Sequence, residues 1–241
     1  MDKVALITGG ARRLGAAITR RLHADGWRVV IHCQRSTTDA DALAARLNSA
    51  RAASSHVVQT NLAEAAAPEH LVAAASARWG RLDALVNNAA VFTPAPLADV
   101  GLDDWQQTLD VNLRAPFLLA QAAAGALAAN GGAIVNLTDI YAERPKAGYV
   151  VYCVSKAGLA GLTRALAREL APAVRVNAVA PGAILWPEDA ADADRQALLA
   201  RTPLGRCGEA TDIADAVAYL LGARYVTGQI LAVDGGRSLN D

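Results

Sequence analysis

Short apolar runs alternate with longer amphipathic or Ala-rich stretches along this chain, and this alternation restricts the fold more than any other feature. The runs have the length and β-branched content of buried strands, and the longer stretches have helical spacing. Strands are expected at Val4–Thr8, Arg28–Cys33, His56–Gln59, Leu82–Asn87, Ala133–Leu137, Arg175–Val179 and Gln229–Val233. Helices are expected up to about His23 and at about Asp39–Ser49, Pro68–Trp79, Asp103–Ala129, the Tyr152/Lys156 stretch ending near Ala171, and Asp212–Leu221. The pattern predicts one α/β domain over residues 1–241, with a parallel sheet covered on both faces.

The charge balance indicates small and local partners. The chain has 241 residues, of which 53% are hydrophobic, and 23 basic residues match 23 acidic ones. The chain therefore has no excess of positive charge that would attract nucleic acid or an anionic membrane. The three scattered cysteines suggest a reducing compartment, and no apolar run approaches the roughly 20 residues of a membrane span. We expect a cytoplasmic protein without nucleic-acid, membrane or metal partners.

A proton-donating group is predicted where the fifth strand meets the following helix. Tyr152 and Lys156 are four residues apart and share one helix face. The ammonium would favour the phenolate and so lower the pKa of Tyr152. Asp139 ends the preceding strand and is placed to face Tyr152 across a cleft. The alternative is a solvated helix face, because a Tyr and a Lys at this spacing are common.

A glycine turn between the first strand and the first helix predicts a phosphate site. Thr8–Gly15 opens a helix, whose N-terminal N–H groups and dipole attract an anion. The second strand ends without the acidic residue that an NAD site uses for the ribose hydroxyl. It continues instead into Arg35 and Ser36, which suit a 2′-phosphate, and Arg13 adds a second cation. We therefore expect NADPH, the alternative for Arg35 being an ordinary exposed loop residue.

Two segments without strong periodicity follow the carboxyl ends of predicted strands, where open α/β sheets bind ligands. They are Val91–Gly101 and Ile184–Arg206. We interpret both as walls of the binding cleft and the second as a lid over it.

Six motifs in order resemble the short-chain dehydrogenase/reductase family over essentially the whole chain. They are the glycine turn, Asn87-Asn88-Ala89, Asn112, Tyr152-x-x-x-Lys156, Pro181-Gly182 and Asp234-Gly235-Gly236. The resemblance implies a Rossmann-type doubly wound domain, a seven-stranded sheet in the order 3-2-1-4-5-6-7, and usually a homotetramer. It makes Tyr152 the acid, Lys156 its partner and ribose ligand, and Asn112 the holder of a relay water. The implied cofactor-binding residues are Gly9, Arg13, Leu14, Gly15, Arg35, Ser36, Asn61, Leu62, Asn88, Ala89, Tyr152, Lys156, Pro181 and Gly182.

Two departures from the family pattern, together with His32-x-x-Arg35-Ser36 and with Phe92 after the Asn-Asn-Ala motif, resemble its pteridine reductase branch. Arg13 replaces the middle glycine of the turn, and Asp139 replaces the usual catalytic Ser. The branch implies that Phe92 stacks on a pterin, that Asp139 and Tyr152 supply protons, and that Arg13, Arg35 and Ser36 bind NADPH.

The chemistry of the substrate agrees with these departures. Hydride addition to a ring C=N bond needs a proton on nitrogen, which a carboxylic acid can deliver if burial raises its pKa. Leu185 and Trp186 are expected to close the other side of the pocket. The alternatives are core packing for Phe92, a cap or loop role for Asp139, and lid packing for Trp186.

The leading hypothesis is thus an NADPH-dependent pteridine reductase acting on dihydropterins, oxidised pterins or dihydrofolate. A carbonyl reductase of the 3-oxoacyl type is the enzyme alternative, although its expected Ser is missing. A non-catalytic NADPH-binding sensor is the alternative from another class, and the intact Tyr152/Lys156 pair argues against it.

Overall fold

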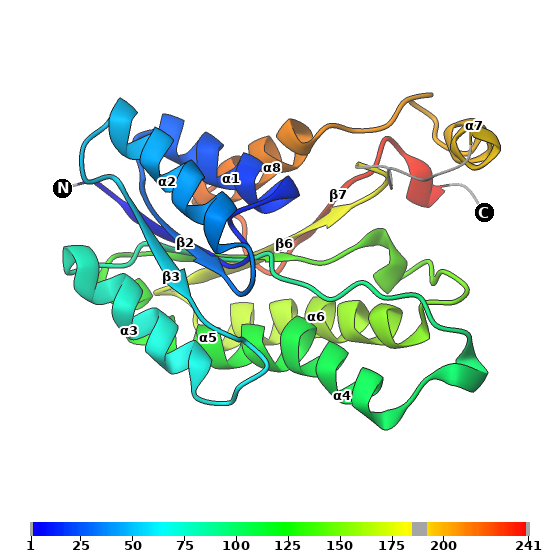
Figure 1. The fold of residues 1–241 in the computed structure, drawn as a ribbon, viewed down its shortest axis with the longest axis horizontal. Coiled ribbons are helices and arrows are strands. Elements are labelled where there is room, and N and C mark those ends of the chain that lie inside the picture. The colour runs from blue at the N-terminus through cyan, green and yellow to red at the C-terminus, as the bar shows by residue number, and fades with distance from the viewer. Residues whose placement is uncertain (1, 185–191, 240–241) are drawn as a thin grey trace.

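The computed structural model describes residues 2–184 and 192–239, in which seven strands form one parallel sheet (Figure 1). Their order is β3-β2-β1-β4-β5-β6-β7, which confirms the predicted sheet and its topology. The strands are β1 Val4–Ile7, β2 Arg28–Cys33, β3 Ser55–Gln59, β4 Ala84–Asn87, β5 Ala133–Leu137, β6 Arg175–Pro181 and β7 Ile230–Val233. Two have the predicted bounds, and the others differ by one or two residues at one end.

Helices cover both faces of the sheet (Figure 1). On one face lie α1 Arg13–Ala24, α2 Thr37–Ala50 and α8 Ala210–Gly222, and on the other α3 Ala67–Trp79, α4 Leu102–Leu109, α5 Ala115–Ala129 and α6 Val150–Glu169. Single-turn elements are Leu97–Asp99, Ile140–Ala142 and Arg237–Leu239. The two faces follow from alternation in β1, because Ala5 and Ile7 pack with α1 and α8 while Val4 and Leu6 pack with α3 and α5.

The long helix predicted at Asp103–Ala129 is interrupted. A π-helical turn, Asp110–Arg114, separates α4 from α5, and the Ala115 N–H donates to the Asp110 carbonyl five residues back. Pro116 explains the irregularity, because it has no N–H to offer the carbonyl of Asn112, four residues before it. The π-helical turn therefore contains Asn112, a residue expected to act in catalysis.

The predicted lid also differs from expectation. Within it, α7 spans Asp192–Ala200, although the sequence shows no strong periodicity there. Figure 1 places α7 beside the C-terminal segment, at the end of the sheet where β7 lies. Leu185 and Trp186 lie outside the described residues.

Helix α6 is the one helix in the described residues that is long and apolar enough to cross a membrane, at 20 residues and a mean hydropathy of 1.2. Its sequence includes Lys156, Arg164 and Arg168, so it is not an uninterrupted apolar run of the kind that the sequence analysis excluded. Half of the segment is buried inside the protein, and α6 packs on β6 and α4. It is thus a core helix of this fold.

Candidate active site

The predicted site residues leave the sheet at one edge, because the carboxyl ends of its parallel strands lie together. Thr8 follows β1, Asn88 follows β4, and Asp139 is the second residue after β5. The Thr8 hydroxyl oxygen accepts hydrogen bonds from the backbone N–H groups of Asn88 and Ala89, at 2.9 and 3.0 Å. This junction fixes the Asn-Asn-Ala motif against the start of the glycine turn.

The structure brings Asp139 and Tyr152 into direct contact. The Tyr152 hydroxyl donates a 2.8 Å hydrogen bond to Asp139 Oδ2. Asp139 Oδ1 accepts from the Tyr141 N–H at 2.9 Å and so caps the short turn Ile140–Ala142. The cap role considered for Asp139 and its approach to Tyr152 are therefore both present, one on each carboxylate oxygen.

Burial controls the proton affinities of this pair. Burial raises the pKa of Asp139, against the opposing effects of the Tyr141 N–H, the Tyr152 hydroxyl and Lys156. Burial and the Asp139 carboxylate raise the pKa of Tyr152 as well. The sequence predicted the opposite direction for Tyr152, because it weighed the cation and not the carboxylate that accepts the phenol proton.

Lys156 lies behind the pair rather than between its members. Its side chain is 3% exposed, and Nζ donates a 2.7 Å hydrogen bond to the Leu137 carbonyl. The ammonium lies 5.6 Å from the centre of the Tyr152 ring. Burial lowers the pKa of Lys156 to about 8, and Asp139 acts against that shift. The helix spacing thus placed both side chains on one face, as predicted.

Asn112 connects the loop after β4 to helix α6. Its side chain accepts from the Val91 N–H at 2.7 Å, and its Nδ2 donates to the Val91 carbonyl at 2.9 Å. The same amide donates to Ser155 Oγ at 3.0 Å, and Ser155 donates to the Tyr152 carbonyl at 2.7 Å. The carboxamide is thereby occupied, whereas the backbone carbonyl is the group that Pro116 leaves without a helical donor. Sequence reasoning missed Ser155, whose signal was its place three residues after Tyr152.

Phe92 lies at the mouth of the site and is 49% exposed, which excludes simple core packing. Its ring stacks on Tyr149 with centroids 4.4 Å apart and meets the edge of Tyr152 at 4.6 Å. Lys146 Nζ lies 4.4 Å from the centre of the Tyr149 ring. Sequence reasoning missed Tyr149, which covers one face of Phe92.

The glycine turn is compact enough to require its glycines. Gly9 has φ +61°, and a Cβ on Gly15 would lie 2.0 Å from the Gly9 carbonyl oxygen. Asn88 Nδ2 donates to the carbonyl of Thr8 at 2.8 Å and to that of Gly9 at 3.1 Å. Arg13 has φ +49°, a left-handed conformation that favours the glycine usual at this position. Leu14, next to it, is half-buried.

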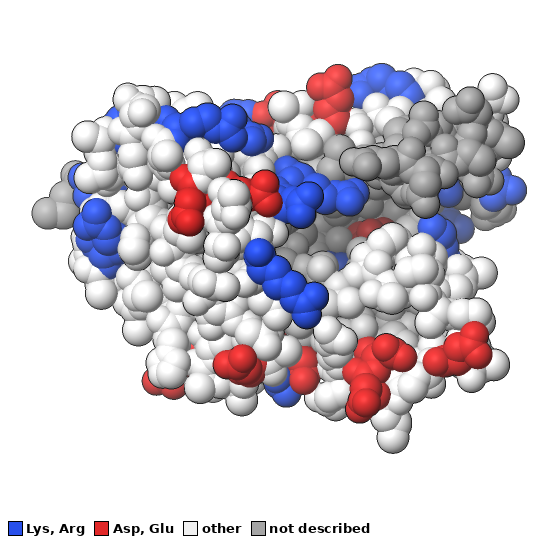
Figure 2. Space-filling view, in the orientation of Figure 1, with Lys and Arg blue, Asp and Glu red and all other residues white. Residues whose placement is uncertain are grey.

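A cavity of about 310 Å³ adjoins this turn. Its lining consists of Gly9, Ala11, Arg12, Cys33, Gln34, Arg35, Ser36, Val91 and Gln107. Ser36 is the residue before α2, and its side chain makes no capping hydrogen bond there. Arg12 joins Arg35 and Ser36 in this cavity, whereas the predicted Arg13 does not line it. Figure 2 shows basic side chains around a hollow near the centre of this face.

The remaining predicted cofactor residues lie along the same edge. Asn61 Oδ1 accepts from Gln34 Nε2 at 2.9 Å and from the Ala63 N–H at 3.2 Å, and Leu62 is buried. Pro181 ends β6, and Gly182 is pressed against Asp234, whose Cβ would lie 2.5 Å from a Cβ added to Gly182. No side chain would fit at Gly182 without moving Asp234.

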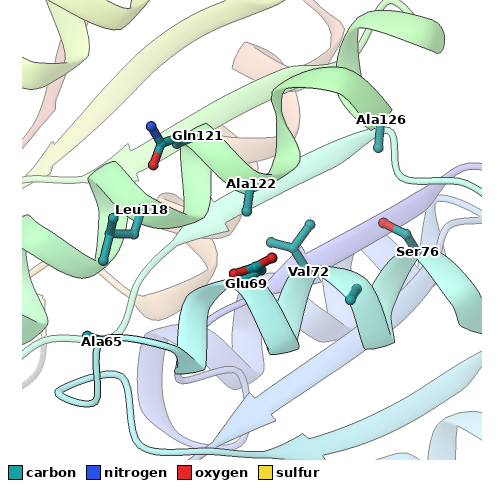
Figure 3. A pocket seen from close by; sticks show the side chains of 9 residues that line it. Ala65, Glu69, Val72, Ser76, Leu118, Gln121, Ala122 and Ala126 are labelled. Atoms are coloured by element: carbon teal, nitrogen blue, oxygen red, sulfur yellow. The ribbon is translucent and has the colours of Figure 1, made fainter.

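A larger cavity, about 550 Å³, lies between α3 and α5 (Figure 3). Its lining consists of Ala65, Glu69, Val72, Ala73, Ser76, Leu118, Gln121, Ala122 and Ala126. None of the predicted site residues that the structure describes lines it, so volume alone does not locate the chemistry here.

These features define an α/β protein with a dinucleotide-type glycine turn and a Tyr/Lys proton-transfer site. The family model described as "Enoyl-(Acyl carrier protein) reductase" matches residues 9–238. The chain belongs to the short-chain dehydrogenase/reductase family, and the sequence prediction of this family is confirmed.

Curated relatives of two activities have similar identity to this chain. A putative ketoacyl reductase 2 of the granaticin polyketide synthase, from Streptomyces violaceoruber, is 40% identical and covers 98% of the chain and 96% of the relative. Pteridine reductase 1 of Leishmania tarentolae is 37% identical with the same coverage. The 3-oxoacyl-[acyl-carrier-protein] reductase FabG of Staphylococcus aureus is 35% identical and covers 98% of each chain.

A solved structure has the same fold. The blue fluorescent protein from a metagenomic library, crystallised in complex with NADPH, superposes with a TM-score of 0.91 and is 41% identical over 98% of this chain and 97% of its own.

Proposed function

We propose that this protein is an NADPH-dependent reductase of pterin rings. The observation that carries the proposal is the 2.8 Å hydrogen bond from the Tyr152 hydroxyl to Asp139, at the position where relatives of the family keep a hydroxyl. A buried carboxyl group with a raised pKa is suited to hold a proton for a ring nitrogen.

NADPH fits the residues around the glycine turn. Gly9 and Gly15 leave room for a pyrophosphate, because a Cβ on Gly15 would fill the turn. Arg35, Arg12 and Ser36 line the adjoining cavity and would hold the 2′-phosphate. The solved structure described above, which was crystallised in complex with NADPH, supports this choice. When bound, the nicotinamide supplies the hydride.

The chain's own groups would handle the proton. Tyr152 donates its proton to the ring nitrogen as hydride arrives at the adjacent carbon, and Asp139, when protonated, returns a proton to the phenolate through their hydrogen bond. Lys156 opposes the negative charge that develops on the phenolate. Phe92 offers an apolar face to a flat heterocycle at the mouth of the site.

A 3-oxoacyl-type carbonyl reductase is the second candidate, favoured by the ketoacyl reductases among the relatives at 40% and 35% identity. Ketone reduction places negative charge on oxygen, which hydrogen-bond donors stabilise. An ionised Asp139 would repel that charge, so this candidate needs Asp139 to remain protonated.

The test is NADPH oxidation with a panel of dihydropterins, oxidised pterins, dihydrofolate and 3-oxoacyl thioesters, for the wild type, Asp139→Asn and Asp139→Ser. We expect pterin turnover in the wild type and a loss of about 10²-fold or more in both variants, the usual scale of a lost acid. Turnover of thioesters alone, retained or raised in Asp139→Ser, would replace the pterin assignment by the second candidate. Tight NADPH binding without any turnover would favour the sensor.

We also propose a homotetramer, as the family resemblance implies, and a cytoplasmic location, as the scattered cysteines suggest. Exposed apolar side chains on α5 and α6, Phe117, Val150 and Val154, support an association of subunits there. Sedimentation equilibrium tests the assembly.

A further inference from the structure

One imidazole lies between the two loops that border the proposed cofactor site. His32 is in β2, and its side chain is 2% exposed. Nδ1 lies 3.1 Å from the Gly9 backbone nitrogen, in the glycine turn, and Nε2 lies 3.1 Å from the Thr60 carbonyl oxygen, just before Asn61. A single buried side chain thus joins the turn to the loop that follows β3.

The partners determine the tautomer of His32. The Gly9 N–H can only donate, so Nδ1 must be the unprotonated acceptor. The Thr60 carbonyl can only accept, so Nε2 must carry the proton. Only the neutral ring protonated at Nε2 makes both bonds, and burial, which lowers the pKa of His32 to about 4, favours that neutral form.

The hydrogen bond between His32 and Gly9 is made at the most tightly packed part of the glycine turn. The His32 carbonyl also accepts from the Gly10 N–H at 2.9 Å, so one residue holds two successive amides of the turn. Gly9 has a positive φ, and its carbonyl is the atom that leaves no room for a Cβ on Gly15. A shift of Gly9 would therefore disturb the opening of α1, which faces the proposed pyrophosphate.

We propose that His32 is a positioning residue that fixes the glycine turn in the shape that receives the cofactor, by accepting the Gly9 N–H and donating to Thr60. The inference rests on the proposed NADPH binding. His32 is buried beneath the turn and touches no reacting atom, so its loss should weaken cofactor binding and leave the chemical step intact.

Three variants separate the two bonds. In His32→Asn the amide oxygen replaces Nδ1 as the acceptor for Gly9, in His32→Gln the amide nitrogen replaces Nε2 as the donor to Thr60, and His32→Leu removes both. His56→Leu is the matched control, since His56 lies on the adjacent strand β3, in register with Val30 and not with His32.

The measurements are the Kd for NADPH, kcat at saturating NADPH, and hydrogen exchange of the Gly9 amide in the ligand-free protein. We expect His32→Leu and His32→Gln to raise the Kd about tenfold and to speed Gly9 exchange, as the loss of one hydrogen bond predicts. His32→Asn and His56→Leu should stay within about threefold of the wild type, and kcat should change by less than about twofold in all four.

Two results would overturn the inference. One is wild-type affinity and wild-type Gly9 exchange in His32→Leu. The other is a ¹⁵N spectrum of the wild type that shows Nδ1 protonated at neutral pH, a test that needs no variant to fold. If the wild type itself does not bind NADPH, the proposed function fails, whereas the exchange and ¹⁵N measurements still decide the role of His32 in the turn.

Discussion

The Tyr152 hydroxyl and Asp139 Oδ2 are 2.8 Å apart, and the phenol donates to the carboxylate. The two groups therefore share one proton rather than acting separately. The negative charge of Asp139 raises the pKa of Tyr152. The hydrogen bond from Tyr152 lowers the pKa of Asp139, against the larger rise that burial causes. Chemistry at this site should respond to changes in either member.

Tyr152→Phe should raise the pKa of Asp139, because the variant removes a hydrogen bond that stabilises the carboxylate. Titration of the Asp139 carboxyl by ¹³C NMR measures the shift. The same variant should lose about 10²–10⁴-fold in turnover, the range for general acid catalysis. An unchanged Asp139 titration would mean that the two groups are not coupled in solution.

Arg35→Ala should weaken NADPH more than NADH, by about 1.5–3 kcal/mol for a lost charge-assisted hydrogen bond. Arg12→Ala should show the same preference, because Arg12 lines the same cavity. Binding titrations with both coenzymes measure the difference. Equal losses for NADPH and NADH would show that these guanidinium groups do not contact the 2′-phosphate.

Arg13→Gly should stabilise the ligand-free fold by about 1 kcal/mol, because Arg13 has φ +49° and a side chain is disfavoured in that region. Ala53→Gly is the matched control, with φ +52° in a loop at the opposite edge of the sheet. Urea unfolding measures both. Stabilisation by Ala53→Gly alone would show that the Arg13 side chain makes contacts that compensate for its backbone.

His32 should contribute to the loss of folding stability at acidic pH. Its pKa in the folded protein is lowered from 6.5 to about 4, so the neutral ring stabilises the fold fully above pH 6.5, and this stability is lost as the pH falls from 6.5 toward 4. The contribution is roughly 3 kcal/mol at about 1.4 kcal/mol per pKa unit. Urea unfolding between pH 7 and 4 should show a shallower loss in His32→Asn than in the wild type.

Sequence reasoning succeeded where spacing and burial act together. The period of the apolar runs located each strand of the sheet, and the four-residue spacing placed Tyr152 and Lys156 on one face. It failed where the outcome depends on contacts distant in sequence. The pKa of Tyr152 depends on a carboxylate 13 residues away, and the stacking of Tyr149 on Phe92 joins two separate loops.

Local irregularity was also hard to predict. Pro116 lies inside Asp103–Ala129, which the sequence predicted as one continuous helix, and its missing N–H accompanies the π-helical turn before it. Arg12 and Arg13 are adjacent in sequence, and the structure shows that Arg12 lines the cavity while Arg13 has a left-handed backbone.

The predicted site residues and the loops that lead into the strands lie at opposite ends of the sheet. Thr8, Asn88, Asp139 and Gly182 all emerge from the carboxyl edge, whereas the loops that enter the strands, such as 51–54 and 130–132, lie at the other end. Exposed positions in those entry loops, such as Ala52, are therefore suitable for attaching a fluorophore. A label there would lie at the end of the sheet opposite the glycine turn and the Asp139/Tyr152 pair, and could report on unfolding without occupying the site.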